Sequence, residues 1–591
     1  MAGCRLPKKV LWASSLTKAG IQTAMDHLKE NDLPEFQGIL REAEARTEGD
    51  YILGFNYSPL LTLTRAYGQT LSYGRCQTTL LQLVYLRDKA IREFRSEPYW
   101  NVEVTYAKGF KGLLIGEDEK GMKFFRKDDA TEALGKSGGT GTVVAYEMQE
   151  KKEKAPLLYN LAKLQQDMGR RYSFPPNKTL EIAQTLYEKY KILSYPRTDS
   201  RYLSMDVYDE ISGHLKSCCF GSFAMAINKI DFSMLQADKS YFNDLKVTDH
   251  HALIPTINAD MEAAYVSLSE DEKRVFDAVV LSVIAIFYPA YEYDATKIIV
   301  EIGGNRFKST GTTIRRLGYR QLFINTDEEK KSGLQILPEL SEGDSLAVDS
   351  AALQDKKTEP PNKFNDETIV KVMEKYGIGT SATRADIIQK LQNPKRQFVI
   401  REKGQYSVTE LGEEYIRIVP EELKAPEISQ QFEENLKKIN TGDLSKEEFL
   451  AGLIEDISNN IDRFTAVQIP DEKKIGYEAA KQRESREHLG TCPKCGAEVR
   501  SGQYGAYCVG KCGMSLGRVR GKTLTDEQVT ALLNGRKVYV TGLKKREGDG
   551  TYSAYFIPDG IEEYSYKTTS GEQKKGWQFK FSVQFKPGKK R

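Results

Sequence analysis

Apolar residues recur at helical spacing through the first 95 residues of the chain. This pattern predicts a helix over 17–28, after a start rich in Ser and Thr, and a second helix over 77–94. In the second segment several apolar side chains can share one face: Leu80, Leu83, Val84 and Ile91. The N-terminal region is therefore expected to be helical.

The pattern changes to alternation in two segments that lie far apart. Residues 98–148 and 291–350 carry alternating apolar and polar positions interrupted by glycines, which is typical of β-strands. Between them, residues 157–290 return to helical spacing apart from a short extended piece at 191–196. Because the β-type segments flank a helical insert, we expect one β-domain assembled from two separated pieces.

The C-terminal third begins with a polar linker at 355–366 that carries prolines, and a helical region follows to about residue 465. Residues 470–490 are charged and lack a sustained apolar face, so they form either a linker or a solvated helix. The last hundred residues contain four cysteines followed by short strand patterns.

Composition places the chain among folded proteins that do not span a membrane. The chain has 591 residues and a mass of 66.8 kDa, which corresponds to about three to five domains. Hydrophobic residues make up 40% and charged residues 29%, which argues against disorder. The longest uncharged apolar run, Ala278 to Tyr291, is shorter than the roughly twenty residues that a bilayer requires. With no secretory signal pattern and only eight cysteines, a cytoplasmic location is expected.

The net charge of +3 hides an asymmetry along the chain. From Arg536 to the end there are 13 Lys and Arg against 6 Asp and Glu, a net of +7, which leaves −4 for the remainder. The chain ends in the basic sequence FKPGKKR (585–591). A basic tail suits a polyanionic partner such as DNA, although a solubilising end has the same composition.

One turn carries several reactive side chains together. The segment Leu193 to Ser200 reads LSYPRTDS and follows a predicted helix for which Asn177 is the expected N-cap. A tyrosine hydroxyl such as that of Tyr195 can attack phosphorus and form a covalent phosphotyrosine. A phenol with a pKa near about 10 needs positive charge or a base nearby, and Arg197 can supply fixed charge to phosphate oxygens. The alternative is ordinary packing, since the chain contains 32 tyrosines.

The sequence SYPRTDSRYLS resembles the active-site signature of type IA DNA topoisomerases, in which the nucleophilic tyrosine precedes x-Arg-Thr-Asp-Ser. Four further segments resemble motifs of that family in the same order, and the resemblance covers about residues 8–465: AEARTEGDYILGFNYS (43–58), LSYGRCQTTLLQLV (71–84), DHHALIPT (249–256) and GIGTSATRADIIQKL (377–391). The forms look similar to the topoisomerase III subgroup. The resemblance places Tyr195 on the nucleophile, Arg197 on the arginine that helps to hold the scissile phosphate, and His250 on the first histidine of its motif.

Further DNA-binding candidates follow from these motifs. Arg75 and Gln77 stand at a helix start, where the helix dipole favours phosphate. One of the adjacent His250 and His251 can hydrogen-bond a phosphate or move a proton, and the alternative is a buried structural pair. The remaining candidates are expected to cradle a single strand, with a capped helix turn as the alternative for the last four: Asp199, Ser200, Thr380, Ser381, Thr383 and Arg384.

The resemblance also implies a fold and a reaction. The fold is an α+β multidomain, toroidal clamp with helical lobes, a split β-arch and a C-terminal zinc-ribbon-like module. The reaction is ATP-independent cleavage of single-stranded DNA through a 5′-phosphotyrosine, followed by strand passage and rejoining. The implied partners are single-stranded and negatively supercoiled DNA, and the chain is expected to act as a monomer. The expected parts are a helical base lobe (1–95 and 357–469), a β-arch (96–156 and 291–356), a helical lobe with the tyrosine (157–290), a linker (470–490) and a C-terminal DNA-binding region (491–591).

The sequence departs from the family pattern in two ways. Cys76 and Ser381 replace a usual valine and a usual proline in the binding motifs. Family members also carry an N-terminal Toprim domain whose acidic residues bind Mg²⁺ beside the tyrosine, and no residue here matches those acids. The alternatives are a truncated fragment, a chain that needs a separate Toprim-bearing polypeptide, and a non-catalytic DNA-binding clamp. A tyrosine nickase would need a histidine cluster for its metal, which five histidines with one adjacent pair do not provide.

A second chemical pattern lies near the C-terminus. Cys492 and Cys495 form a C-x₂-C pair, and Cys508 and Cys512 form a C-x₃-C pair twelve residues later. Four thiolates on two turns can hold Zn²⁺ tetrahedrally, and the alternative is a set of unligated thiols. Aromatic residues interleave with basic residues in the same region and are candidates for stacking on bases: Tyr504, Tyr507, Tyr539, Tyr552, Tyr555, Phe556, Trp577, Phe579 and Phe581.

Overall fold

The computed structural model describes residues 8–11, 18–247, 250–323, 335–394, 396–484, 488–502, 505–520, 522–544, 551–567 and 573–585. It shows a mixture of α-helices and β-strands that divides into two compact units. The first unit comprises Met1–Pro59 and Ser72–Arg463, and the second comprises Leu60–Leu71 and Phe464–Arg591.

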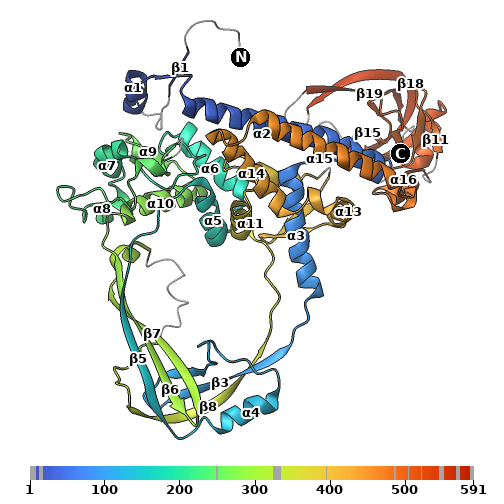
Figure 1. The fold of residues 1–591 in the computed structure, drawn as a ribbon. Helices are drawn as coiled ribbons and strands as arrows, with labels where there is room; N and C mark the ends of the chain where they lie inside the picture. Colours follow the sequence, from blue (N-terminus) through green and yellow to red (C-terminus); the bar gives the residue numbers. More distant parts are fainter. Residues whose placement is uncertain are drawn as a thin grey trace, which may run out of the picture. The chain divides into compact units, whose positions relative to one another are not determined.

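In the first unit, helices from the two ends of its sequence pack against one another. Figure 1 shows α2 (Pro34–Arg65) beside α15 (Lys446–Ala466). The ammonium of Lys446 bridges Glu44 and Glu48 at 3.0 and 3.1 Å. The other elements of this region are β1 (Lys9–Val10), α1 (Lys18–Asp26), β2 (Lys29–Glu30), α3 (Arg75–Glu93), α13 (Glu410–Ile418), η4 (Glu421–Leu423) and α14 (Pro426–Thr441).

Both helices expected near the N-terminus are confirmed. The segment 17–28 forms α1, with Thr17 outside the described residues, and the segment 77–94 forms α3. In α3 the side chains of Leu80, Leu81 and Val84 are buried, and each contributes roughly 1.5–3 kcal/mol by leaving water. The helix ends where Phe94 takes an extended conformation and leads into a strand.

Six strands close into a barrel in the order β3-β4-β7-β6-β5-β8. The first three strands in the chain come from one segment and the last three from another: β3 (Pro98–Tyr106), β4 (Lys111–Leu114), β5 (Thr140–Glu153), β6 (Tyr291–Ile302), β7 (Asn305–Arg316) and β8 (Ser345–Lys357). Alternating positions such as Val102, Val104, Ile298 and Val300 fill the interior. Closure pairs the edge strands, and α4 (Lys127–Gly135) contacts β3 and β8.

The residues between the two barrel segments form a helical insert with one large apolar core. Its elements are α5 (Leu161–Tyr172), α6 (Pro176–Glu188), α7 (Met205–Ser217), α8 (Gly221–Ile227), η1 (Asp244–Lys246), α9 (Met261–Val266) and α10 (Glu270–Ala285), followed after β7 by η2 (Gly318–Phe323). The apolar run from Ala278 to Tyr291 supplies the buried half of α10 and the first residue of β6. No described helix is long and apolar enough to cross a membrane.

The expected cap of α6 is wrong. The helix already includes Pro176, and Pro175 occupies the N-cap position without a side-chain cap bond, so Asn177 lies within the first turn. Proline suits the first helical position, held by Pro176, because its fixed φ matches a helix and an N–H at that position would have no partner within the helix.

A hairpin and two short helices connect the barrel to the C-terminal helices of the first unit: α11 (Asp366–Lys375), α12 (Arg384–Leu391), β9 (Val399–Glu402) and β10 (Gln405–Val408). Asp366 is 1% exposed. Its carboxylate accepts hydrogen bonds from Arg401 at 2.8 and 2.6 Å and from the Tyr406 hydroxyl at 2.8 Å. The ion pair with Arg401 and the hydrogen bond from Tyr406 hold α11 against the hairpin of β9 and β10.

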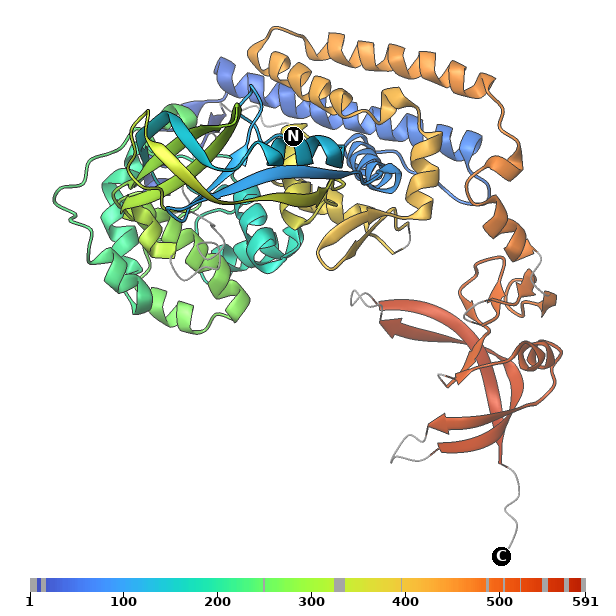
Figure 2. The ribbon, with the colours of Figure 1, turned by 90° about the horizontal axis from the view of Figure 1, so that it is seen from below.

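The second unit carries a four-stranded sheet in the order β14-β19-β18-β17. Figure 2 shows its long paired strands β18 (Thr551–Lys567) and β19 (Gln573–Gln584) in red. Residues 470–490 contain η5 (Asp471–Lys473), α16 (Tyr477–Glu484) and the start of β11. The remaining elements are β11 (His488–Thr491), β12 (Glu498–Arg500), β13 (Tyr507–Cys508), β14 (Met514–Ser515), β15 (Arg518–Val519), β16 (Lys522–Thr523), α17 (Asp526–Leu533) and β17 (Val538–Lys544).

Replacing Arg401 by Ala is expected to lower the free energy of unfolding by about 3 kcal/mol, because it leaves the Asp366 carboxylate buried without its cation. Arg417→Ala is the matched control, since Arg417 pairs with Glu413 on the surface with 64% of its side chain exposed and should cost less than about 1 kcal/mol. Urea unfolding followed by fluorescence measures both. Equal shifts for the two variants would contradict the role given to Asp366.

Candidate functional site

The turn that carries Tyr195 is held from both sides by a neighbouring loop. The backbone N–H of Ser194 donates to the carbonyl of Ile254 at 2.9 Å, and the N–H of Ile254 donates to the Ser194 hydroxyl at 3.0 Å. Leu193 and Pro255 pair as an isolated β-bridge. These bonds fix the backbone directly before Tyr195, whose side chain is half-buried.

Two aromatic rings stand against Tyr195. The ring of His250 lies 4.5 Å away between centroids, and the ring of Tyr187 on α6 packs edge-on at 5.5 Å. His250 is half-buried, and its carbonyl accepts a hydrogen bond from the Thr198 hydroxyl at 2.9 Å. The tyrosine ring therefore sits beside an imidazole in a position that both loops define.

The two adjacent histidines take different environments. His251 is 3% exposed, and its Nδ1 lies 2.7 Å from the carbonyl oxygen of Ala252. Burial lowers the pKa of His251 from its ordinary value to about 4, so this ring is neutral at pH 7. The structure thus directs His250 toward Tyr195 and encloses His251 in the core.

Arg197 follows Tyr195 by two residues and has an unused donor. Its Nε is buried, and it has no hydrogen-bond partner within the described part of the chain. A buried guanidinium donor without an acceptor is costly, so a bound anion would satisfy it. The Ser200 side chain, in contrast, has an internal partner: its hydroxyl donates to the Lys246 carbonyl at 3.1 Å and stabilises the turn.

Asp199 links this turn to the loop at 377–384. Its carboxylate accepts a hydrogen bond from the Ser381 hydroxyl at 3.2 Å and lies 3.9 Å from Nη1 of Arg384. Nε and Nη1 of Arg384 are buried without hydrogen-bond partners in the described structure. Asn160, which caps α5 and donates to the Asp199 carbonyl at 2.9 Å, holds the turn from the other side. Sequence reasoning missed Asn160, although an Asn at a helix start was a usable signal.

The loop at 377–384 reaches its place through two glycines with positive φ. Gly377 has φ 61° and Gly379 has φ 67°. A Cβ at Gly379 would lie 2.6 Å from Ile387, so only glycine fits there. The hydroxyl of Thr383 then accepts from the N–H of Thr380 at 2.9 Å and closes the turn before α12.

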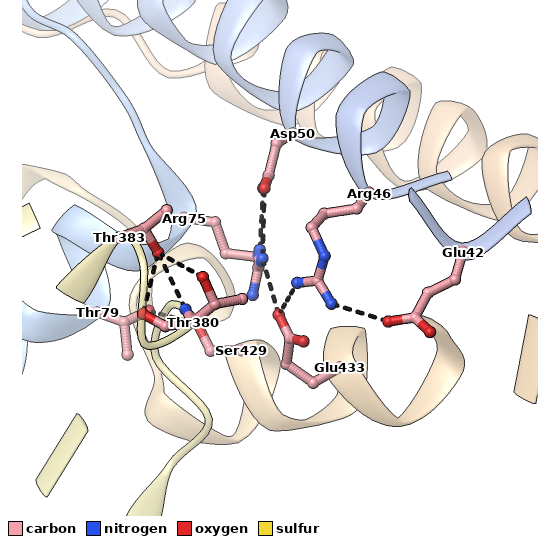
Figure 3. Close-up of polar contacts among 9 residues, drawn as sticks. All are labelled: Glu42, Arg46, Asp50, Arg75, Thr79, Thr380, Thr383, Ser429 and Glu433. Carbon is pink, nitrogen blue, oxygen red and sulfur yellow. Dashed lines mark hydrogen bonds and ion pairs between the residues drawn. The ribbon is translucent and has the colours of Figure 1, made fainter. Parts of the chain in front are cut away.

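Arg75 lies in a network of buried and half-buried charges, shown in Figure 3. Its side chain is 2% exposed and contacts Asp50 at 3.0 Å and Glu433 at 3.2 Å. Glu433 also accepts from Arg46 at 2.7 Å, and Arg46 bonds Glu42 at 3.2 Å. Arg75 thereby joins α2, α3 and α14. Sequence reasoning missed these carboxylates, because their partners stand up to 358 positions away.

The start of α3 contacts the loop at 377–384, which contains Gly377 and Gly379. The Cys76 thiol accepts a hydrogen bond from the backbone of Gly379, and burial raises the pKa of this thiol. Gln77 is half-buried at the first turn of α3, and the N-cap residue Gly74 makes no side-chain cap bond. The structure therefore brings the motif at 71–84 to the motif at 377–391, and the latter to Asp199.

The four cysteines of the second unit form one cluster. Their sulfur atoms all lie within 4.8 Å of one another. Cys492 and Cys512 are 3.6 Å apart, and Cys495 and Cys508 are 3.4 Å apart. A tetrahedral Zn²⁺ site with Zn–S bonds of about 2.3 Å places its sulfurs about 3.8 Å apart. The cluster is therefore compatible with a zinc-binding module.

The aromatic residues of the second unit divide between core and surface. Phe556 and Phe579 are buried in its core. Lys537 lies 5.0 Å from the ring of Tyr555, and Lys494 lies 4.8 Å from that of Trp577. Tyr504 and the basic residues 586–591 lie outside the described residues.

No group of three or more carboxylates lies beside Tyr195 among the described residues. Asp199 is engaged with Ser381 and Arg384. In the described ranges, the cysteine cluster is the only group of three or more side chains that is suited to hold a metal ion.

Comparison with known proteins identifies a family that the chain resembles over most of its length. Residues 35–451 match the family described as DNA topoisomerase. The chain is 34% identical to DNA topoisomerase 3 of Bacillus subtilis over 76% of its own length and 64% of the relative's. It is 33% identical to the Bacillus licheniformis protein of the same name, over 76% and 63% of the two chains. The chain thus spans less than two thirds of the length of these relatives.

A solved structure shows the same fold. Full-length topoisomerase I from Thermotoga maritima superposes with a TM-score of 0.59 at 24% identity, over 85% of this chain and 78% of that one. The prediction of a type IA topoisomerase fold is confirmed by this match.

His251→Asn should make stability less dependent on pH. The unfolded chain takes up this proton near pH 6.5 and the folded chain only near pH 4, so the native protein loses stability as pH falls from 6.5 to 4. The expected loss is on the order of 3 kcal/mol. Urea unfolding at pH 7 and pH 4.5 tests this, with the exposed His488→Asn as control. An unchanged pH dependence in His251→Asn would contradict the expectation.

Proposed function

Because the chain belongs to the DNA topoisomerase family, we propose that it carries the DNA-cleaving body of a type IA topoisomerase of the topoisomerase III kind. The substrate is single-stranded DNA, including the unpaired regions of negatively supercoiled DNA. The observation that carries the proposal is the placement of Tyr195 beside His250 and two residues from Arg197, which has a buried, unsatisfied donor.

In the proposed reaction the Tyr195 oxygen attacks a backbone phosphorus. The new bond joins tyrosine oxygen to phosphorus, and the bond from phosphorus to the 3′ oxygen breaks. The tyrosine hydroxyl gives up its proton and the departing 3′ oxygen gains one, which leaves a 5′-phosphotyrosine and a free 3′-hydroxyl. After another strand passes through the break, the 3′-hydroxyl reverses the attack. The phosphodiester energy is kept in the covalent link, so ATP is not required.

Arg197 is proposed to neutralise the phosphate as charge develops on its oxygens, which suits a buried donor that lacks an acceptor. His250 is proposed to hydrogen-bond the phosphate or move the tyrosine proton, since its ring lies against the Tyr195 ring. Both roles follow from position, with Tyr187 on the other side excluding water from the tyrosine ring.

The other candidates are proposed to act at two levels. Those in the 377–384 loop and at the start of α3 are proposed to touch DNA directly: Gln77, Thr380, Ser381, Thr383 and Arg384. Gln77, Thr380 and Thr383 are half-buried or exposed, whereas Ser381 and Arg384 are buried, and Arg384 has two donor atoms without a partner in the described structure. The other residues are proposed to hold these loops in place, because the structure gives them internal partners: Arg75, Asp199, Ser200 and His251.

The toroidal clamp and the domain limits given from the sequence remain part of this proposal. A barrel that draws strands from two separated segments supports a split β-arch. The helical lobes on either side of the arch would then frame the path of the DNA. We further propose that the protein acts as a cytoplasmic monomer.

Two metals enter the proposal differently. Zn²⁺ would be held by Cys492, Cys495, Cys508 and Cys512 and would stabilise the small fold around them, as the sulfur spacings support. Mg²⁺, which type IA topoisomerases commonly use, would assist rejoining through acidic ligands outside the described residues, such as those of a Toprim domain.

A non-catalytic DNA-binding clamp is the second candidate. It is favoured by one observation, the lack of a carboxylate set for Mg²⁺ beside Tyr195 in the described part of the chain. The two candidates differ in whether a covalent complex forms.

The purified chain is expected to form a covalent complex with a 3′-end-labelled single-stranded oligonucleotide. On a denaturing gel this complex should be lost in Tyr195→Phe and retained in Tyr187→Phe, the matched loss of a hydroxyl from a tyrosine whose ring centroid lies 5.5 Å from that of Tyr195. A 5′-end-labelled oligonucleotide should instead give a shortened free fragment, because the protein remains on the 5′ phosphate. Bound DNA without a covalent complex, with and without Mg²⁺, would favour the non-catalytic clamp.

Removal of zinc is expected to unfold the cysteine-bearing module. One zinc per chain should be released by a thiol-reactive reagent and detected with a colorimetric chelator, and Cys492→Ser should abolish this release. Cys219→Ser is the control, since Cys219 is exposed and outside the cluster. Release of no zinc from the native chain would show that the four thiols are unligated.

A further inference from the structure

The β-barrel carries a basic hollow that the proposed cleavage reaction does not use. It has a volume of about 540 Å³ and is lined by Tyr99, Lys123, Lys356, Lys357, Thr358 and Glu359. The hollow lies where β3 begins and β8 ends, because Tyr99 pairs with Lys356 and Pro98 with Lys357 across the sheet. None of its lining residues belongs to the loops that hold Tyr195.

The lysines of this hollow lack the carboxylate partners that other barrel lysines have. Lys111, Lys152 and Lys297 each form ion pairs with glutamates, at 2.8 Å, 3.3 Å and 2.8 Å. Within the described structure, exposed Lys356 and Lys357 form no ion pair, and Lys123 contacts only the ring of Tyr99 at 4.9 Å. Glu359 is the one carboxylate in the lining. Three clustered cations against one anion leave a net positive site.

Two aromatic rings accompany these charges. The ring of Tyr99 lies 6.2 Å from the ring of Phe125, which is 54% exposed. An exposed phenylalanine costs hydrophobic free energy in the unbound protein, and stacking on an unpaired base would recover it. Cations for phosphates and flat apolar rings for bases are the combination that single-stranded nucleic acids require.

We propose that the hollow is a second binding site for single-stranded DNA. The ammonium groups of Lys356, directly opposite Tyr99 in the sheet, and of Lys123, over the Tyr99 ring, contact phosphates, while Lys357 adds positive charge at the end of β8. A base stacks on the exposed ring of Phe125 beside Tyr99. The inference rests on the proposed function, from which it takes single-stranded DNA as the ligand. It adds that the barrel grips a strand by itself, at a site distinct from the one around Tyr195. Duplex DNA fits less well, because its bases are already stacked on each other.

The site also touches both connections between the barrel and the helices. Thr358, in its lining, accepts at its hydroxyl from the N–H of Glu97 and donates its own N–H to the Glu97 carbonyl, both at 2.9 Å. Residue 97 lies on the path from α3 into β3, and residue 358 lies on the path from β8 to α11. A strand bound here therefore contacts the point where both connections run together.

Photocrosslinking of the full chain with oligonucleotides that contain 5-iodouracil tests the inference, with crosslinked peptides identified by mass spectrometry. Crosslinks to Tyr99 or Phe125 are expected with single strands and not with duplex. Lys356→Gln with Lys357→Gln should reduce them at least fivefold, with a further loss in Phe125→Ala. Lys108→Gln with Lys151→Gln removes the same charge from exposed barrel lysines without ion pairs and should leave the crosslinks unchanged.

Three results would overturn the inference: no crosslink at either ring, equal loss in the two double variants, or equal crosslinking to duplex. The covalent complex at Tyr195 is measured on the same samples with a short oligonucleotide, and Lys356→Gln with Lys357→Gln should retain it. Barrel crosslinks without the covalent complex would contradict the proposed cleavage reaction and leave the second site supported. A covalent complex without barrel crosslinks would contradict only the proposed second site.

Discussion

A buried guanidinium is costly unless acceptors such as carboxylates pair with it, and the buried Arg75 sets this requirement in the first unit. Its partners come from α2 and α14, so Asp50 and Glu433 must approach the start of α3 together. Phe432 covers the flat face of the same guanidinium at 3.8 Å. Removal of any one member would leave buried charge uncompensated. The helices from the two ends of the unit are therefore held in one arrangement.

That arrangement decides where the binding loop lies. A Cβ added at Gly377 would lie 3.4 Å from the Glu433 side chain, and the backbone of Gly379 donates a hydrogen bond to the Cys76 thiol beside Arg75. The following residues Ser381 and Arg384 then reach Asp199, two positions beyond Arg197. A chain of contacts thus runs from the charged network through the glycine loop to the turn that carries Tyr195.

Charge pairing separates structural cations from candidate binding cations in this protein. Arg401 and Lys446 have carboxylate partners at close distances and hold elements together. Arg75 combines both features, because it pairs with Asp50 and Glu433 while its Nη1 is buried without a partner in the described structure. Arg197 has a buried donor without an acceptor, and the barrel residues Lys356 and Lys357 have no ion-pair partner in the described structure. An unpaired cation leaves its electrostatic free energy available to a ligand. The same reasoning supports a phosphate at Arg197 and a DNA strand on the barrel.

The sequence by itself determined the local features of this protein. Apolar spacing predicted α1 and α3, alternation marked the barrel strands, and five ordered motifs led to the type IA topoisomerase family. The Cys492 to Cys512 spacing led to the cluster that the structure shows. These signals are readable because helix and strand periods, turn residues and short motifs depend on neighbours close in the chain.

Only the tertiary structure decided which residues face one another. Adjacent His250 and His251 look alike in sequence, yet one ring contacts Tyr195 and the other is buried. The sequence made Arg75 a phosphate-binding candidate at a helix start, but its side chain is buried and pairs with Asp50 and Glu433. The lysines at 356 and 357 looked like part of a polar connector until strand register set them beside Tyr99. Burial and pairing arise between segments hundreds of residues apart, and no local pattern encodes that approach.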